Sequence, residues 1–374
     1  MVQRQTDASA SGLVTVTEQM QLRTLGFGIG DVSWSSVRMT SDDWMCVVHP
    51  QRAAPGKCSS QQDRKALQAT VIDPLGNQTR SLQLDGLTSA QVSPFRHVIA
   101  LSTAEKIYTV CLNTDKVISW NRFPCEVEYW TWVGKSVIGI IGRERIYHWL
   151  IDSDSLSFVV NRSSRLRNTQ ISSYAVDRYQ GWHVLQALKS DSDGSITGIV
   201  QVYSTTAHNH STILEAEATS ISSFRFAANS YTSQVFVVVN KTAAKSAKIS
   251  VVELGPQKPD RNLLVNRCES FHWQSPDDIA TNIVCSPQSS LIYVLSKKGM
   301  LFVFGLEACC AYILNERVCC DIVFLSVLDK QTGGVLAVAR NGQILSIHAQ
   351  VNQPLERDGR GHGKADIPDQ VTRL

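Results

Sequence analysis

A pair of short β-type segments recurs seven times along the chain, and this repeat limits the possible folds more than any other feature. Each copy has a nearly all-apolar run, a polar turn and a second run in which apolar and polar residues alternate. The copies begin at Trp44, His97, Ser136, Gly181, Gln234, Ser290 and Gly334. Their starts are 39 to 56 residues apart. A period of about 40–50 residues with several strands per unit is typical of β-propeller blades.

Burial explains why such units must pack together. A single four-stranded sheet cannot bury both of its faces, whereas sheets packed radially bury them and leave only short edges. The apolar first run suits an inner strand, and the alternating second run suits a strand nearer the outside. Only residues 41–45 and 61–68 suggest helix, and neither has a sustained 3.6-residue period. The fold class predicted is therefore all-β.

We predict one seven-bladed β-propeller over residues 18–350. Residues 1–17 are expected to form a flexible leader. Residues 351–374 are polar and rich in Gly and Pro, so we expect a disordered C-terminal tail.

Charge and composition disfavour several partners. The net charge is only +3, from 36 basic and 33 acidic residues, so we expect no nucleic-acid partner. No apolar run reaches the roughly 18 residues of a membrane span, so we expect no direct membrane insertion. No signal peptide is recognisable. The ten cysteines are therefore predicted to be reduced thiols of a cytoplasmic protein.

Four segments carry distinctive aromatic and polar patterns. They are LGFGIGDVSWSSVRMTSDDWMCV (25–47), VEYWTWVGKSVIGIIGRERIYHW (127–149), TQISSYAVDRYQGWHVL (169–185) and GVLAVARNGQILSI (334–347). These segments resemble the N-terminal, or terminal-domain, propeller of the clathrin heavy chain family, which has similar aromatic, Met-x-Ser-Asp and Trp-x-Trp patterns in the same order. The resemblance runs from about residue 20 to 348.

The resemblance implies a non-enzymatic module without cofactors. It would bind short linear motifs in the disordered tails of adaptor and accessory proteins at coated pits and coated vesicles. In the family a helical leg follows the propeller and trimerises. The residues after His348 show no helical period, so we expect no self-trimerisation from this chain alone. A fragment, an isoform and a free-standing protein all remain open.

The family reads a Leu-apolar-x-apolar-acidic peptide in the groove between its first two blades. Lys106 and Lys116 could meet the acidic residue of such a peptide, whereas Asp115 opposes it. The alternative is that these are ordinary residues of a blade face. The matching positions are Ile99, Lys106, Tyr108, Val110 and Lys116.

Two further family sites have partial counterparts. An axial site for aromatic-containing peptides maps to Trp34, Gln170, Ser172 and Leu188. A third groove, between the fourth and fifth blades, uses a Trp and an Arg in the family. Trp182 matches the Trp, but Ala207 or His208 occupies the position of the Arg, so a charge-assisted contact would be missing.

Signals for other functions are weak. Asp191-Ser-Asp193-Gly194 imitates the start of a calcium loop, but Val202 stands where a Glu is needed, so a hairpin turn is expected. His208 and His210 have no further ligand at a suitable spacing, and we predict no metal site. A WD-type interaction scaffold remains an alternative, although Gly-His and Trp-Asp pairs do not recur. A propeller hydrolase is less favoured, because no carboxylate cluster can be assigned.

Overall fold

The computed structural model describes residues 6–8, 12–51, 66–76, 78–179, 181–192, 194–205, 211–227, 229–243, 245–255, 266–307 and 311–350. The chain divides into two compact units, which are described separately. Among the described residues, the first unit contains 18–161 and 336–345, and the second contains 6–8, 12–17, 162–335 and 346–350. Asp193, Ala207, His208, His210 and the predicted tail lie outside the described residues.

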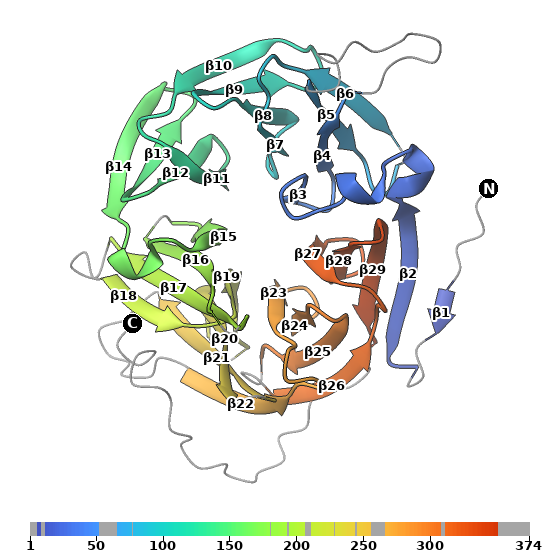
Figure 1. Cartoon of the computed structure of the whole chain (residues 1–374). Helices are drawn as coiled ribbons and strands as arrows, with labels where there is room; N and C mark the ends of the chain where they lie inside the picture. The colour runs from blue at the N-terminus through green and yellow to red at the C-terminus, as the bar shows by residue number, and fades with distance from the viewer. Residues whose placement is uncertain are drawn as a thin grey trace. The chain divides into compact units, whose positions relative to one another are not determined.

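The first unit contains three antiparallel sheets of four strands. Figure 1 shows them side by side as blades that follow one another in chain order. The first blade is β3 (Val37–Met39), β4 (Met45–Pro50), β5 (Leu67–Ile72) and β6 (Thr79–Gln83). The second is β7 (Ser89–Val92), β8 (Val98–Ser102), β9 (Lys106–Cys111) and β10 (Val117–Arg122). The third is β11 (Val127–Gly134), β12 (Val137–Gly142), β13 (Arg145–Leu150) and β14 (Ser155–Asn161).

The second unit repeats this architecture in three more sheets. The fourth blade is β15 (Gln170–Val176), β16 (Trp182–Ser190), β17 (Ile196–Ser204) and β18 (Ser211–Glu215). The fifth is β19 (Ala218–Phe224), β20 (Ser233–Ala243), β21 (Ser246–Gly255) and β22 (Asn266–His272). The sixth is β23 (Ala280–Ser286), β24 (Leu291–Ser296), β25 (Met300–Gly305) and β26 (Ala311–Arg317).

A seventh sheet joins strands from both ends of the chain, in the order β1-β2-β29-β28-β27. The predicted all-β, seven-bladed propeller is thus confirmed. Strand β2 begins at Val14, four residues before the boundary predicted at 18. The strands of this sheet are β1 (Thr6–Ala8), β2 (Val14–Gln21), β27 (Val323–Asp329), β28 (Gly334–Ala339) and β29 (Gln343–Ala349).

Helix is rare in the described part of the chain. Three short 3₁₀ helices occur, η1 (Leu22–Leu25), η2 (Ile29–Asp31) and η4 (Ser164–Leu166). Residues 41–45 form bends and the start of β4 rather than a helix. Of the other candidate segment, residues 61–65 lie outside the described residues, and residues 67–68 begin β5. Where the structure describes these two segments, they form no helix, as the missing 3.6-residue period indicated.

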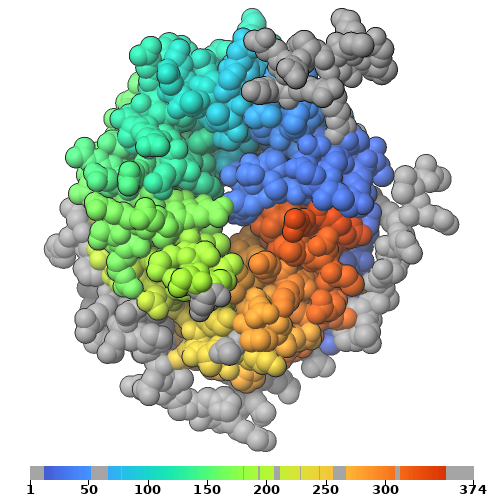
Figure 2. All heavy atoms as spheres, viewed as in Figure 1, coloured from blue at the N-terminus to red at the C-terminus, as the bar shows by residue number. Residues whose placement is uncertain are grey.

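Six of the seven predicted strand pairs are the two central strands of a four-stranded sheet, and the seventh pair, β28 and β29, lies inside the five-stranded sheet. Every residue of β8, β12, β24 and β28 is buried, whereas the outer strand β10 is largely exposed. This gradient follows from position, because central strands have a neighbouring blade on each face. In the space-filling view, side chains fill the gaps that the ribbons leave between neighbouring blades of each unit (Figure 2).

Candidate functional site

The predicted first-groove residues lie on one blade of the first unit. Strand β9 alternates, so Lys106, Tyr108 and Val110 share one of its faces. Ile99 pairs with Val110 across the sheet, and both belong to an apolar cluster shared with the first blade. These side chains therefore face the first blade. Ile99 and Val110 are buried core residues, whereas Lys106 and Tyr108 are only half-buried.

An exposed aromatic side chain extends this face outward. Trp120 of β10 pairs with Tyr108, and their ring centroids lie 6.4 Å apart. The ammonium of Lys106 lies 5.0 Å from the centre of the Trp120 ring, within the range of a cation–π contact. Trp120 is 49% exposed, and its neighbours Val117 and Ile118 are 55% and 49% exposed. An indole platform beside a cation therefore faces solvent.

The turn after β9 forms the charged end of this surface. The backbone N–H of Cys111 donates to the carbonyl of Lys116, and that of Asp115 donates to the carbonyl of Cys111, each at 2.9 Å. Asp115 has φ 57°, a left-handed conformation that Asp tolerates better than most residues. Its carboxylate forms an ion pair with Arg80 of β6 on the first blade. Lys116 is exposed.

Arg80, Lys106, Tyr108, Lys116 and Trp120 form a surface at the first two blades. We call it the β6–β10 groove, after the groove that the clathrin resemblance predicts there. The sequence comparison did not single out Arg80 or Trp120. Trp120 could have been found by counting register back from the turn, because it stands opposite Tyr108 in the β9–β10 hairpin. Arg80 carries no local signal, since its partner Asp115 is in another blade.

The predicted axial residues are divided between the two units. In the first unit, Trp34 is half-buried and lies 5.2 Å, ring centre to guanidinium carbon, from Arg38. Arg38 also donates a hydrogen bond to the carbonyl oxygen of Trp34 and lies 5.9 Å from the ring centre of Tyr129. Trp34 therefore contacts the guanidinium of Arg38 through both its ring and its carbonyl oxygen.

In the second unit, exposed Gln170 pairs with half-buried Leu188 across β15 and β16. The hydroxyl of Ser172 donates to the carbonyl of Gln186 at 3.2 Å, so its hydrogen is bonded within the sheet. That these residues and Trp34 form one site remains a prediction.

Trp182, the third-groove residue, is part of the core of the second unit. It is 8% exposed and packs in an apolar cluster with residues that include Val200 and Phe236. Its backbone N–H donates to the carboxylate of Asp177 at 2.7 Å. Burial and this turn contact account for Trp182 without a ligand. Its proposed partner positions, Ala207 and His208, lie outside the described residues.

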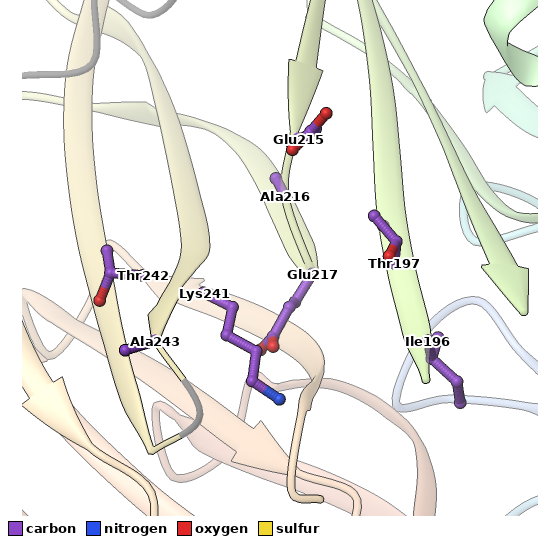
Figure 3. Close-up of a pocket in the computed structure, with 9 residues that line it drawn as sticks. Ile196, Thr197, Glu215, Ala216, Glu217, Lys241, Thr242 and Ala243 are labelled. Atoms are coloured by element: carbon purple, nitrogen blue, oxygen red, sulfur yellow. The ribbon is translucent and has the colours of Figure 1, made fainter. Parts of the chain in front are cut away.

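A pocket of about 310 Å³ lies between the fourth and fifth blades, at the opposite strand ends from Trp182. Its lining includes Thr197, Glu217 and Lys241. In Figure 3 the side chains of Glu217 and Lys241 lie beside one another, between the strands that carry Thr197 and Thr242. A Cβ at Gly198 would meet the carbonyl oxygen of Ala216 at 1.8 Å, so glycine permits the close approach of the backbones there.

Glu217 is the most unusual ionisable group in this pocket. Its side chain is only 5% exposed. One carboxylate oxygen accepts from the backbone N–H of Ala280 at 2.9 Å, and the other has no hydrogen-bond donor among the described residues. Burial raises the pKa of Glu217 to about 7, with the charge of Lys241 acting in the opposite direction.

The segment that imitates the start of a calcium loop is a hairpin turn in the structure. Gly194 donates its N–H to the carbonyl of Asp191 in a hairpin turn, and the Asp191 carboxylate accepts from Lys189 and Thr197. Across the described ranges, no group of three or more His, Cys, Asp or Glu side chains could hold a metal ion. Within the same part of the chain, no helix is long and apolar enough to cross a membrane.

Comparison with known proteins places the chain in context. No family model matches it. It is 28% identical over 364 residues to clathrin heavy chains 1 and 2 of Oryza sativa subsp. japonica. It is also 26% identical over 355 residues to clathrin heavy chain 1 of Arabidopsis thaliana. The rice matches cover 92% of this chain and 20% of each relative.

The chain is similar to the terminal propeller of clathrin heavy chains. The match falls on their N-terminal fifth and corresponds to the terminal propeller domain. The chain therefore spans about one fifth of the length of these relatives.

Solved structures support the same fold. A chain in the crystal structure of the mitotic checkpoint complex has a TM-score of 0.55 and covers 86% of this clathrin-like chain. The β-propeller domain of Cps50 (Swd1) from Myceliophteria thermophila has a TM-score of 0.52 and covers 84%. Both are 10% identical to it, so they show the propeller fold alone.

Proposed function

We propose that the chain binds short linear motifs from adaptor proteins of clathrin-coated pits and vesicles, in the β6–β10 groove. The observation that carries the proposal is the exposed Trp120 platform, with Lys106 over its ring and Tyr108 beside it. It lies on the blade face that the clathrin resemblance assigns to peptide binding. In this role the chain is a cytoplasmic binding module and performs no catalysis.

The groove suits an extended peptide rather than a folded domain. Alternate side chains of an extended strand point the same way, so two apolar side chains of a motif can contact Tyr108 and Trp120. Lys116 lies in the turn of the β9–β10 hairpin and would meet an acidic group there, whereas Lys106 pairs with Arg122 at the other end of the hairpin. An interface this small is weak, and we expect a dissociation constant of micromolar order or weaker, about −8 kcal/mol or less in magnitude. Several copies acting together would raise the effective affinity.

The test is a titration of the protein with a fluorescent peptide of the Leu-apolar-x-apolar-acidic type. Trp120→Ala should weaken binding about 3- to 10-fold, since aromatic contacts are worth roughly 0.5–1.5 kcal/mol. Lys106→Glu combined with Lys116→Glu should also weaken it, because the acidic group then meets like charge.

Phe158→Ala is the matched control for Trp120→Ala. Phe158 is 53% exposed on β14 of the same unit, outside the β6–β10 groove. Its removal should leave the affinity unchanged. Absence of binding by the folded wild type, or equal losses in Trp120→Ala and Phe158→Ala, would contradict the proposal.

A further inference from the structure

The charged end of the β6–β10 groove already contains an acid that belongs to the chain. We propose that Asp115 competes with a bound peptide for Arg80, and that this ion pair sets the charge selectivity of the groove. The inference rests on the proposed peptide-binding function. It adds a residue-level rule for which peptides the groove accepts.

The sheet register shows toward which blade the side chain of Arg80 points. Arg80 of β6 pairs with Val71 of β5, and Val71 lies in the apolar cluster that joins the first blade to the second. Paired residues share a face of a sheet, so Arg80 is directed toward the second blade. Its ion pair with Asp115 therefore joins the two blades across the end of the groove.

The backbone holds Asp115 in place for this contact. The turn is closed by hydrogen bonds from Cys111 to Lys116 and from Asp115 to Cys111. The left-handed backbone of Asp115 further restricts where its short side chain can point. The carboxylate thus stands where an acidic group of a peptide would have to approach Arg80.

Exposure makes the contact exchangeable. The side chains of Arg80 and Asp115 are 38% and 56% exposed, and ion pairs of this kind are weak and screened by salt. A peptide carboxylate can therefore displace Asp115, but it gains little, because one Arg–carboxylate contact replaces another. Lys106 lies over Trp120, at the opposite end of the β9–β10 hairpin from the Asp115 turn, so its charge does not act on an acidic group beside Arg80. The native groove should therefore prefer acidic over neutral peptides only weakly, with exposed Lys116 as the remaining cation of the turn.

Removal of the Asp115 carboxylate should raise the affinity for acidic peptides and leave the affinity for neutral peptides unchanged. In Asp115→Asn the guanidinium of Arg80 has no carboxylate from the turn. An acidic peptide should then bind about 3- to 5-fold more tightly than it binds to wild type, whereas a neutral peptide should bind as before. Arg80→Gln in the Asp115→Asn background should abolish the gain, because the cation that the peptide acid would meet is absent.

The experiment measures the dissociation constants of two peptides that differ only by Asp or Asn at the acidic position. They are titrated against wild type, Asp115→Asn, Arg80→Gln and the double variant at low and high salt. Asp277→Asn is the control for net charge, because Asp277 is highly exposed and lies in the second unit. We expect the affinity ratio of the two peptides to rise only in Asp115→Asn and to fall again at high salt.

The outcomes distinguish the selectivity proposal from the proposed peptide binding. If both peptides bind but their ratio is unchanged in Asp115→Asn, the selectivity proposal is wrong while peptide binding stands. An equal rise in Asp277→Asn would mean that overall charge, and not the Arg80–Asp115 pair, controls the ratio. If neither peptide binds any folded variant, the proposed function fails and the selectivity rule fails with it.

Discussion

The carboxylate of Glu217, between β18 and β19, accepts a hydrogen bond from the backbone N–H of Ala280 at the start of β23, at 2.9 Å. The backbone carbonyl of Glu217 accepts from the side-chain amide of Gln186 on β16 at 2.9 Å. Its own N–H donates to the carbonyl of Val239 on β20 at 2.8 Å. One residue thus links three consecutive blades of the second unit.

The raised pKa of Glu217 predicts a pH-dependent stability. A carboxyl group whose pKa rises from 4.5 to about 7 on folding binds protons more tightly in the folded state. Its contribution is fully present below about pH 4.5 and is lost as the pH rises through about 7. We expect the free energy of unfolding of wild type to fall by about 2 kcal/mol more than that of Glu217→Gln between pH 5 and pH 8.

Denaturant unfolding at several pH values checks this prediction. Gln keeps the carbonyl oxygen that Ala280 needs and removes the titration. Glu215→Gln is the matched control, because Glu215 lines the same pocket but is largely exposed and paired with Arg165. The same pH dependence in wild type and Glu217→Gln would show that Glu217 does not titrate in this range.

Trp182 should behave as a core residue. Trp182→Ala removes a large buried side chain from the cluster of the fourth and fifth blades, so we expect a loss of about 3–5 kcal/mol in the free energy of unfolding. Trp120→Ala, at the exposed groove, should cost less than about 1 kcal/mol. Thermal and denaturant unfolding measure both. A small loss in Trp182→Ala accompanied by weaker peptide binding would instead support the third groove.

Two glycines with positive φ differ in the space around them. Gly299 has φ +77°, and an added Cβ would meet the carbonyl oxygen of Cys319 at 2.2 Å, whereas Gly194 has φ +82° with nothing within 4 Å. Gly194→Ala should cost about 1 kcal/mol for backbone strain alone. Gly299→Ala should cost at least about 2 kcal/mol, since backbone must also shift. Equal losses in the free energy of unfolding would mean that the backbone at Cys319 can shift at little energetic cost.

Two thiols should differ in reactivity. Hydrogen bonding from Thr114, together with backbone contacts, lowers the pKa of Cys111, whereas burial raises the pKa of Cys125. The thiolate is the reactive form, so Cys111 should be alkylated faster than Cys125 at pH 7.5, although Cys125 is the more exposed of the two. Site-resolved mass spectrometry after limited iodoacetamide treatment measures both rates. Thr114→Val should slow the alkylation of Cys111. An unchanged rate would exclude the Thr114 contact as the cause of the lowered pKa.

The pattern of apolar and polar residues within each strand pair was sufficient to predict the blades. Alternation along 106–111 places Lys106, Tyr108 and Val110 on one face in any antiparallel hairpin, and the structure has this face. The run at 334–339 is apolar throughout, and it is buried as a central strand should be. Such features depend on neighbours a few residues away, so a single sequence contains them. The buried state of Trp182 was less predictable, because an indole serves equally well in a core and at a ligand surface.

By itself, the sequence of this protein determined the seven-bladed all-β fold and the hairpin that carries Lys106 and Tyr108. The reason is that hydrophobic periodicity and turn residues act within a strand pair. Only the tertiary structure decided that Asp115 is paired with Arg80 and that Glu217 is held by Ala280. These partners are far apart in the chain, and they meet because blade packing brings distant backbones together. Charge and burial at those contacts therefore depend on the folded arrangement and leave no periodic trace in the sequence.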